Sequence, residues 1–145
     1  MEKVITEKLW NYIVSNNPDL MLTLKEEGSV FQYLKNKVQS VQPLIEELEE
    51  QNKPAYIIEE ICLEELTREL RPSKYHYIKT LVEEEFEDSF LAMVESGVLT
   101  YEIVNMMLAC QDIFESFNFS EQSEDDRFLR YAVIGEVSAY LMGTV

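Results

Sequence analysis

Apolar residues recur along this chain at the spacing of an α-helix, and no stretch shows the strict apolar/polar alternation of a half-buried strand. The pattern predicts an all-α fold, a single compact multihelical bundle of about six helices, one of them short, with no sheet. Glycine and proline are scarce, at four residues each, which favours long elements and few loops. With the short helix counted, the individual ranges number seven, namely residues 3–15, 18–26, 29–50, 54–70, 74–95, 100–117 and 124–141.

Prolines and glycines indicate where the first helices end. Pro18 cannot continue a helix but suits the first turn of a new one, so Asn17 is predicted to be the N-cap of a short helix over residues 18–26, which Gly28 ends. Pro43 lies inside the next helix, but the apolar register continues across it, which predicts one kinked helix rather than two. That apolar seam consists of Leu34, Val38, Val41, Ile45 and Leu48.

The turn around Pro72 joins the two central helices. Pro72 disfavours helical geometry at Arg71, so the first of them is expected to end near Leu70. Ser73 is the expected N-cap of the helix over residues 74–95, the most strongly patterned element of the chain. Its inward residues are predicted to be Tyr75, Ile78, Leu81, Val82, Phe86, Phe90 and Val94.

The last third of the chain carries four further local predictions. Gly97 is placed to end a helix in the left-handed conformation, and Thr100 is placed to cap the next helix. Ser123 followed by Asp126 resembles a capping box. Gly135 indicates a close helix crossing. We find no internal repeat in the sequence.

The charge of the chain is strongly and unevenly negative, with a net value of −16. Residues 1–45 hold five acidic and five basic residues, residues 46–88 hold fourteen and five, and residues 89–145 hold nine and two. Such a surface repels phosphate, so neither direct nucleic-acid binding nor binding to an anionic membrane is expected.

Length and cysteine usage indicate a small cytoplasmic protein. The 145 residues fit one domain, residues 1–145. The N-terminal residues lack the pattern of a signal peptide, and no apolar run approaches the ~18 residues of a membrane span. Cys62 and Cys110 stand alone, as is typical of buried, reduced thiols. We therefore expect a cytoplasmic location.

The acidic run of residues 83–88 raises the possibility of a metal site, since Glu83 and Glu87 are spaced to share a helix face. Di-iron helical bundles also need Glu-x-x-His motifs. The one histidine is His76, and the residue three positions before it is Ser73. A solvated acidic face is the favoured interpretation, and we predict no metal and no cofactor.

Catalytic groups are not recognisable in this sequence. Ser73 and His76 are better explained as the N-cap and a first-turn residue of one helix than as a nucleophile and its base. Neither cysteine has an activating neighbour, and no glycine-rich phosphate-binding motif is present. We therefore expect a protein that is not an enzyme.

Three consecutive aromatic residues follow the central turn. Tyr75, His76 and Tyr77 point in three directions on one helical turn, so at least one must face away from the core. The plain interpretation is that two pack and one is exposed. The functional interpretation is an aromatic patch beside Arg71 and Lys74, because tyrosine and arginine are enriched in interface hot spots.

Four segments of the chain carry a resemblance to a known family. They are Asn17-Pro18-Asp19-Leu20, Leu70-x-x-Ser73-Lys74-Tyr75, Leu81-Val82-Glu83-Glu84-Glu85-Phe86-Glu87 and the segment from Ile113-Phe114 to Phe119, which is rich in aromatic residues. In order and spacing over about residues 8–142 they resemble domain-of-unknown-function family 1896, small proteins often encoded with conjugative-transposon regions of bacterial genomes. The resemblance implies a compact helical domain, no established activity and no catalytic residue.

Three hypotheses for the function follow. The leading one is a non-enzymatic, acidic interaction module, accessory to a mobile genetic element, that binds a protein partner, with a basic protein as one option. The alternatives are an acidic nucleic-acid mimic that occupies a DNA-binding protein, and an enzyme or small-molecule binder with an unrecognised pocket. Homodimerisation fits all three. The candidate partner-binding residues are Arg71, Lys74, Tyr75, His76, Tyr77, Glu83, Glu84 and Glu87.

Overall fold

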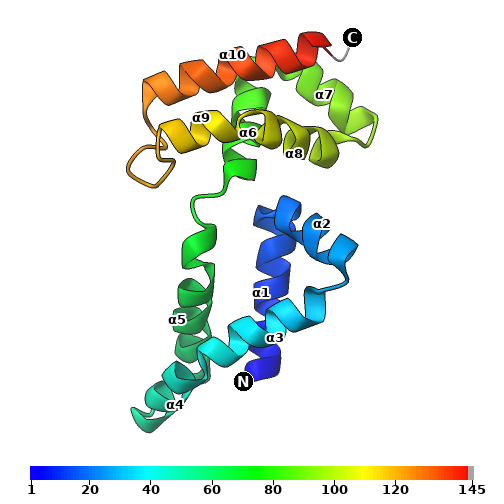
Figure 1. Ribbon diagram of the computed structural model, residues 1–145. Coiled ribbons are helices and arrows are strands. Elements are labelled where there is room, and N and C mark those ends of the chain that lie inside the picture. The colour runs from blue at the N-terminus through cyan, green and yellow to red at the C-terminus, as the bar shows by residue number, and fades with distance from the viewer. Residues whose placement is uncertain (144–145) are drawn as a thin grey trace. The chain divides into compact units, whose positions relative to one another are not determined.

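The structure, a computed structural model, describes residues 1–143 of the chain (Figure 1). Over these residues the fold is all-helical and has no strand, which confirms the predicted class. The predicted number of about six helices is wrong, because three of the predicted helices are each divided in two. The α-helices are α1 (Glu2–Asn16), α2 (Pro18–Glu27), α3 (Val30–Ser40), α4 (Gln42–Glu50), α5 (Ala55–Thr67), α6 (Lys74–Glu85), α7 (Glu87–Glu95), α8 (Leu99–Ala109), α9 (Gln111–Ser116) and α10 (Arg127–Gly143), and a 3₁₀ turn (Arg68–Leu70) follows α5.

Pro43 divides the predicted helix over residues 29–50 into α3 and α4, rather than kinking one helix. Its ring nitrogen has no hydrogen to donate to the carbonyl of Gln39, and the helix is interrupted at Val41, where φ is −103° and ψ is 5°. Pro43 then lies in the first turn of α4, where no donor is needed. The apolar seam nevertheless survives the break. All five of its predicted residues, Leu34, Val38, Val41, Ile45 and Leu48, are buried.

Two other breaks have no proline or glycine to signal them. Phe86 ends α6 with a ψ of 53°, and its carbonyl accepts a hydrogen bond from the N–H of Phe90 that begins α7. Cys110 separates α8 from α9 with a ψ of 4°. The break at Phe86 redirects α7, so that Val94, predicted to face inward, is 48% exposed. Glu83 and Glu87 also lie on different helices instead of one common face.

The helices form two compact units, which we call the N-terminal unit (Met1–Arg71) and the C-terminal unit (from Pro72 onward). Each has its own apolar core. Leu9 and Ile45 are among the most buried residues of the first core, and Ile78 and Phe114 are among those of the second. Whether both units unfold as the predicted single domain stays a prediction.

The two units repeat one arrangement of five helices, although no repeat was expected from the sequence. In the N-terminal unit α1 packs against α2, α3 and α5, and α4 packs against α3 and α5. In the C-terminal unit α6 packs against α7, α8 and α10, and α9 packs against α8 and α10. The order of helices therefore corresponds one to one, and each of these packed pairs has a counterpart in the other unit. The C-terminal unit adds a further contact, between α8 and α10.

Backbone geometry supports the same correspondence at a separation of 69 residues. Asn17 (φ −134°, ψ 59°) and Phe86 (φ −136°, ψ 53°) separate the first two helices of each unit. Gly28 (φ 67°) and Gly97 (φ 73°) end the second helix in the left-handed conformation, as predicted for both.

Buried positions follow the same offset. Residues 5–50 and 74–119 are identical at only seven of 46 paired positions, which explains why sequence inspection missed the repeat. In the first four helices of each unit, corresponding buried residues are 69 positions apart in the chain. In the last helix of each unit, α5 and α10, they are 71 positions apart. The buried pairs are Leu9 and Ile78, Ile13 and Val82, Leu24 and Met93, Leu34 and Ile103, Val38 and Met107, Val41 and Cys110, Ile45 and Phe114, Ile58 and Leu129, Cys62 and Val133, and Leu66 and Val137.

The predicted caps are partly correct. The Oγ atom of Ser73 accepts a hydrogen bond from the N–H of His76 at 3.1 Å, which confirms Ser73 as the N-cap of α6. Thr100 is not a cap, because α8 begins at Leu99. The predicted capping box of Ser123 and Asp126 is wrong, because the last helix begins at Arg127 rather than at residue 124. The cap of α10 is Asp126, whose Oδ1 atom accepts a hydrogen bond from the N–H of Phe128 at 2.7 Å.

Candidate functional site

One polar pocket of the C-terminal unit gathers several of the residues singled out in the sequence. It has a volume of about 400 Å³ and lies between α6, the loop before α10, and α10 itself. We call it the acidic pocket. It is lined by Ser73, His76, Tyr77, Thr80 and Glu84 of α6 and its cap, Glu124 and Asp125 of the loop, and Arg130 of α10.

Helical spacing explains why α6 lines this pocket along its length. The lining residues of α6 recur at intervals of three or four positions, which places them on one side of the helix. The Ser73 cap fixes the first turn of α6, and this turn carries His76, whose side chain is exposed. The pocket therefore opens beside the N-terminal turn of a long, well-capped helix.

Arg130 ties α10 to α6 at the pocket. Its guanidinium donates hydrogen bonds to Glu85 at 2.8 Å and to Glu84 at 2.9 Å. The bond to Glu85, followed by the bond to Glu84, raises the pKa of Arg130 above its usual value, although partial burial opposes the shift. Because Arg130 is neutralised by these two partners, Glu124 and Asp125 give the pocket a net negative charge.

Tyr77 forms the apolar wall of the pocket and brings an unpaired hydroxyl. Its ring packs edge-on against Phe114 and Phe119, with centroids 5.7 and 5.3 Å away. Its hydroxyl oxygen is buried and has no hydrogen-bond partner among the described residues. Burial is the main cause of the raised pKa of Tyr77. A ligand could hydrogen-bond to this hydroxyl only if the pocket opened further, because the oxygen is buried.

The structure places the predicted aromatic patch mostly inside the protein. Tyr75 is 5% exposed and belongs to the core, and Tyr77 is partly buried, so His76 is the exposed member of the three. Lys74 lies beside the Phe114 ring, with Nζ 5.7 Å from its centroid. Arg71 belongs to the N-terminal unit, where its guanidinium donates to the carbonyls of Glu64 at 3.1 Å and Thr67 at 3.4 Å.

The pocket combines three predicted residues with others that the sequence did not indicate. His76, Tyr77 and Glu84 line it, whereas Glu83 and Glu87 are exposed outside it. Thr80, Glu124, Asp125 and Arg130 were missed. Arg130 is 46 positions from Glu84, and nothing in a single sequence pairs residues so far apart. A partner-binding role for any of these residues stays a prediction.

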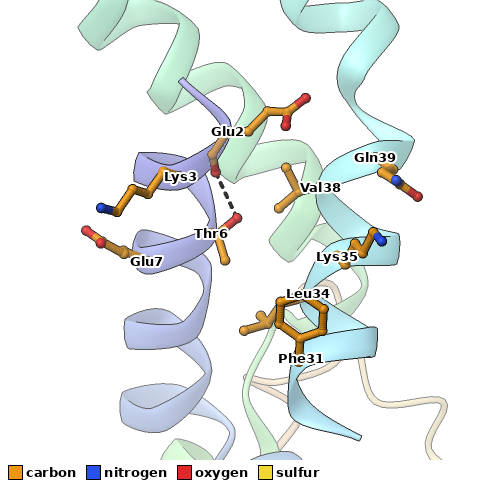
Figure 2. Close-up of a pocket in the computed structure, with 9 residues that line it drawn as sticks. All are labelled: Glu2, Lys3, Thr6, Glu7, Phe31, Leu34, Lys35, Val38 and Gln39. Atoms are coloured by element: carbon orange, nitrogen blue, oxygen red, sulfur yellow. Dashed lines mark hydrogen bonds between the residues drawn. The ribbon is translucent and has the colours of Figure 1, made fainter.

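A second hollow lies in the N-terminal unit and contains none of the predicted site residues. Figure 2 shows this groove, of about 500 Å³, between α1 and α3. Phe31 is 76% exposed at its edge, and two lysines and two glutamates balance its charge. Its lining residues are Glu2, Lys3, Thr6, Glu7, Phe31, Leu34, Lys35, Val38 and Gln39.

Neither cysteine belongs to the pocket, and both are buried. Burial raises the pKa of Cys62, and burial together with the charge of Glu136 raises the pKa of Cys110 from 9.0 to about 12. Among residues 1–143, no three histidine, cysteine or acidic side chains are grouped closely enough to hold a metal ion. The same part of the chain contains no helix with both the length and the apolar character needed to cross a membrane.

The raised pKa of Cys110 predicts a loss of stability in alkali. The folded protein holds the thiol proton more tightly than the unfolded chain does, so this contribution is complete below pH 9.0 and decreases as the pH rises towards 12. In chemical denaturation at a series of pH values, Cys110→Ala should reduce the alkaline decrease in the free energy of unfolding. Cys62→Ala is the matched control and should reduce it less. Equal slopes for wild type and Cys110→Ala would contradict the prediction.

Two five-helix units with the same order of helices, the second of which carries the acidic pocket, make up this all-α protein. Searches with the chain against protein-family models, curated proteins and solved structures find no match.

Proposed function

We propose that this chain is a non-enzymatic interaction module whose C-terminal unit binds a basic segment of a partner protein in the acidic pocket. The observation that carries the proposal is the charge of the pocket. Glu84, Glu124 and Asp125 line it, and its one lysine or arginine, Arg130, is already paired with Glu84 and Glu85.

The partner's chemistry follows from these groups. A guanidinium or ammonium group would pair with the carboxylates of Glu124 and Asp125. A guanidinium could also form a cation–π contact with the ring of Tyr77. The C-terminal unit has fourteen acidic and four basic residues, so its field attracts cationic segments over the distance of the Debye length.

The experiment is fluorescence anisotropy with a labelled nine-residue arginine peptide at physiological salt. The double variant Glu124→Lys, Asp125→Lys should weaken binding at least tenfold, because it replaces the two carboxylates that are not paired with Arg130 by two positive charges. The matched control is Glu49→Lys, Glu50→Lys, which makes the same charge change on exposed residues of α4. We expect less than a twofold effect there. If both double variants weakened peptide binding equally, the peptide would be attracted by the net charge of the protein alone. That result would contradict binding in the acidic pocket.

Nucleic-acid mimicry is a second candidate that uses the same charge. It is favoured by the scarcity of lysine and arginine among the fourteen acidic residues of the C-terminal unit. A mimic competes with duplex DNA for the cationic site of a DNA-binding protein. The test is affinity capture of host DNA-binding proteins by the tagged chain, with and without added duplex DNA. Capture that DNA does not reduce would contradict mimicry.

A small-molecule site is a third candidate, favoured by the unpaired Tyr77 hydroxyl beside the exposed His76. A thermal-shift screen of cationic small molecules tests it. A true ligand should raise the Tm of the wild type and lose most of that effect in Tyr77→Phe. No shift with any compound, while the arginine peptide binds, would favour the interaction module.

A cytoplasmic location, membership of domain-of-unknown-function family 1896 and a role accessory to a mobile genetic element complete the proposal. The all-helical fold is compatible with that family resemblance. Capture of the tagged chain from the cytoplasmic fraction of its host, with the Glu124→Lys, Asp125→Lys variant as control, would identify the partner.

A further inference from the structure

Helices α7 and α8 of the C-terminal unit expose a row of large apolar side chains. The row begins on α7, passes through the turn after it and continues along α8, at steps of three, four, three and seven positions. Each of its residues is between 39% and 63% exposed. We call this row the apolar stripe. It consists of Leu91, Val94, Val98, Tyr101 and Leu108.

The apolar stripe continues from α7 onto α8 because of the turn between them. The N–H of Val98 donates to the carbonyl of Met93 at 3.0 Å, which folds Val98 back onto the last turn of α7, the turn that carries Val94. From Val98 onward, steps of three and seven positions keep Tyr101 and Leu108 on one side of α8. Single exposed apolar residues are ordinary on a protein surface, but a continuous apolar surface marks an interaction site.

The internal repeat supplies a comparison within the same chain. Helices α2 and α3 are the counterparts of α7 and α8, at the offset of 69 residues. Four of the five stripe residues have polar counterparts there, whereas the counterpart of Leu91 is the half-buried Leu22. The five-helix fold therefore does not require an apolar stripe at these positions. The polar counterparts are, in chain order, Lys25, Ser29, Gln32 and Gln39.

The charged residues along the apolar stripe are all acidic. Residues 87–109, which span α7 and α8, hold four acidic residues and no lysine or arginine. Glu87, Asp88 and Glu95 are exposed, and none of them forms an ion pair within residues 1–143. Glu87 and Glu95 lie four positions before and after Leu91, on the same side of α7. An apolar surface with unpaired carboxylates along it is complementary to an apolar surface with cations along it.

We propose that the apolar stripe binds a basic amphipathic helix of a partner protein. The apolar side of that helix covers Val94 and Tyr101, and its lysines or arginines pair with the carboxylates of α7. The net charge of −16 repels acidic partners, including a second copy of this chain, and attracts basic ones. No residue of the stripe lines the acidic pocket, so this surface is separate from the one in the proposed function.

Fluorescence anisotropy of the full chain with a labelled fourteen-residue peptide of leucine and lysine, whose leucines share one helical side, tests the proposal. The wild type should bind this peptide. Tyr101→Gln introduces the residue of the N-terminal unit and should raise the Kd about tenfold, because aromatic residues are common interface hot spots. Its Tm should not change, since Tyr101 is 61% exposed. Tyr56→Gln on α5, where the tyrosine is 62% exposed, is the matched control and should change the Kd by about twofold or less. No binding by the wild type, or equal weakening by both variants, would overturn the proposal.

Two further peptides separate the stripe from attraction to charge alone. A peptide with the same leucines and lysines in scrambled order keeps the charge but has no apolar side, so it should bind about tenfold more weakly. A peptide with glutamate in place of every lysine should not bind. Equal binding of the ordered and scrambled peptides, or binding of the acidic one, would overturn the proposal.

Neutral substitutions test the role of the carboxylates. Glu87→Gln, Glu95→Gln should raise the Kd of the ordered peptide about threefold, whereas Glu49→Gln, Glu50→Gln on exposed residues of α4 should have a smaller effect. Equal effects would contradict pairing with α7. Tyr101→Gln should leave binding of the nine-residue arginine peptide unchanged, so failure of the stripe and failure of the acidic pocket are recognised separately.

Discussion

Phe114→Ala is expected to lower the free energy of unfolding of the C-terminal unit by about 3–5 kcal/mol, since it leaves a large cavity in a close-packed core. Phe114 is 1% exposed, and its ring contacts those of Tyr77 and Phe119. The measurement is urea denaturation followed by far-UV circular dichroism. Phe128→Ala removes the same atoms from a site that is 59% exposed, and it should cost less than about 1 kcal/mol. Similar costs for both variants would contradict the assigned core.

The same experiment tests the prediction of one domain over residues 1–145. The chain has one tryptophan, Trp10, which packs against the core of the N-terminal unit and reports on that unit by fluorescence. If both units unfold as one domain, Phe114→Ala will shift the fluorescence transition as far as the dichroism transition. An unchanged fluorescence midpoint would instead show that the two units unfold separately.

Ile45→Ala is expected to destabilise the N-terminal unit by about 2–5 kcal/mol, as measured by the fluorescence of Trp10 during urea denaturation. Ile45 is 1% exposed and is the counterpart of Phe114 in the internal repeat. Its burial was predicted from the apolar seam that crosses Pro43. The substitution therefore tests both the seam and the correspondence between the two units.

Phe31→Ala is the control for this prediction. Phe31 loses more atoms than Ile45 does, but it is 76% exposed at the edge of the groove between α1 and α3. A surface substitution of this kind should change the free energy of unfolding by about 0.5 kcal/mol or less. A larger effect for Phe31→Ala than for Ile45→Ala would mean that the seam is not the core of this unit.

Local patterns predicted the helices well where the signal lay within a turn or two. Ser73 was identified as a cap from its place after Pro72, and Gly28 and Gly97 were identified as helix ends because glycine adopts positive φ at little cost. The apolar face of the first part of α6 was also predicted, and Ile78, Leu81 and Val82 are buried. These predictions held because a cap or an amphipathic face depends on neighbours three or four residues away.

The candidate site was predicted only in part. His76, Tyr77 and Glu84 were singled out for their residue types, and the structure brings all three to one pocket. The pocket is completed by Arg130 from α10, whose position depends on how that helix packs on α6. Such packing is decided by the fit of whole helix faces, which no spacing in a single sequence expresses.

The sequence by itself determined that this protein is helical, where several helices are capped, and which residues of α3 and α4 face inward. Tertiary structure decided where helices break without proline or glycine, as at Phe86 and Cys110, and that two units of only slight sequence identity share one fold. The physical reason is range. Caps and propensities act over one turn, whereas the course of the backbone at Phe86 is set by packing its ring against a core whose residues come from helices far apart in the chain.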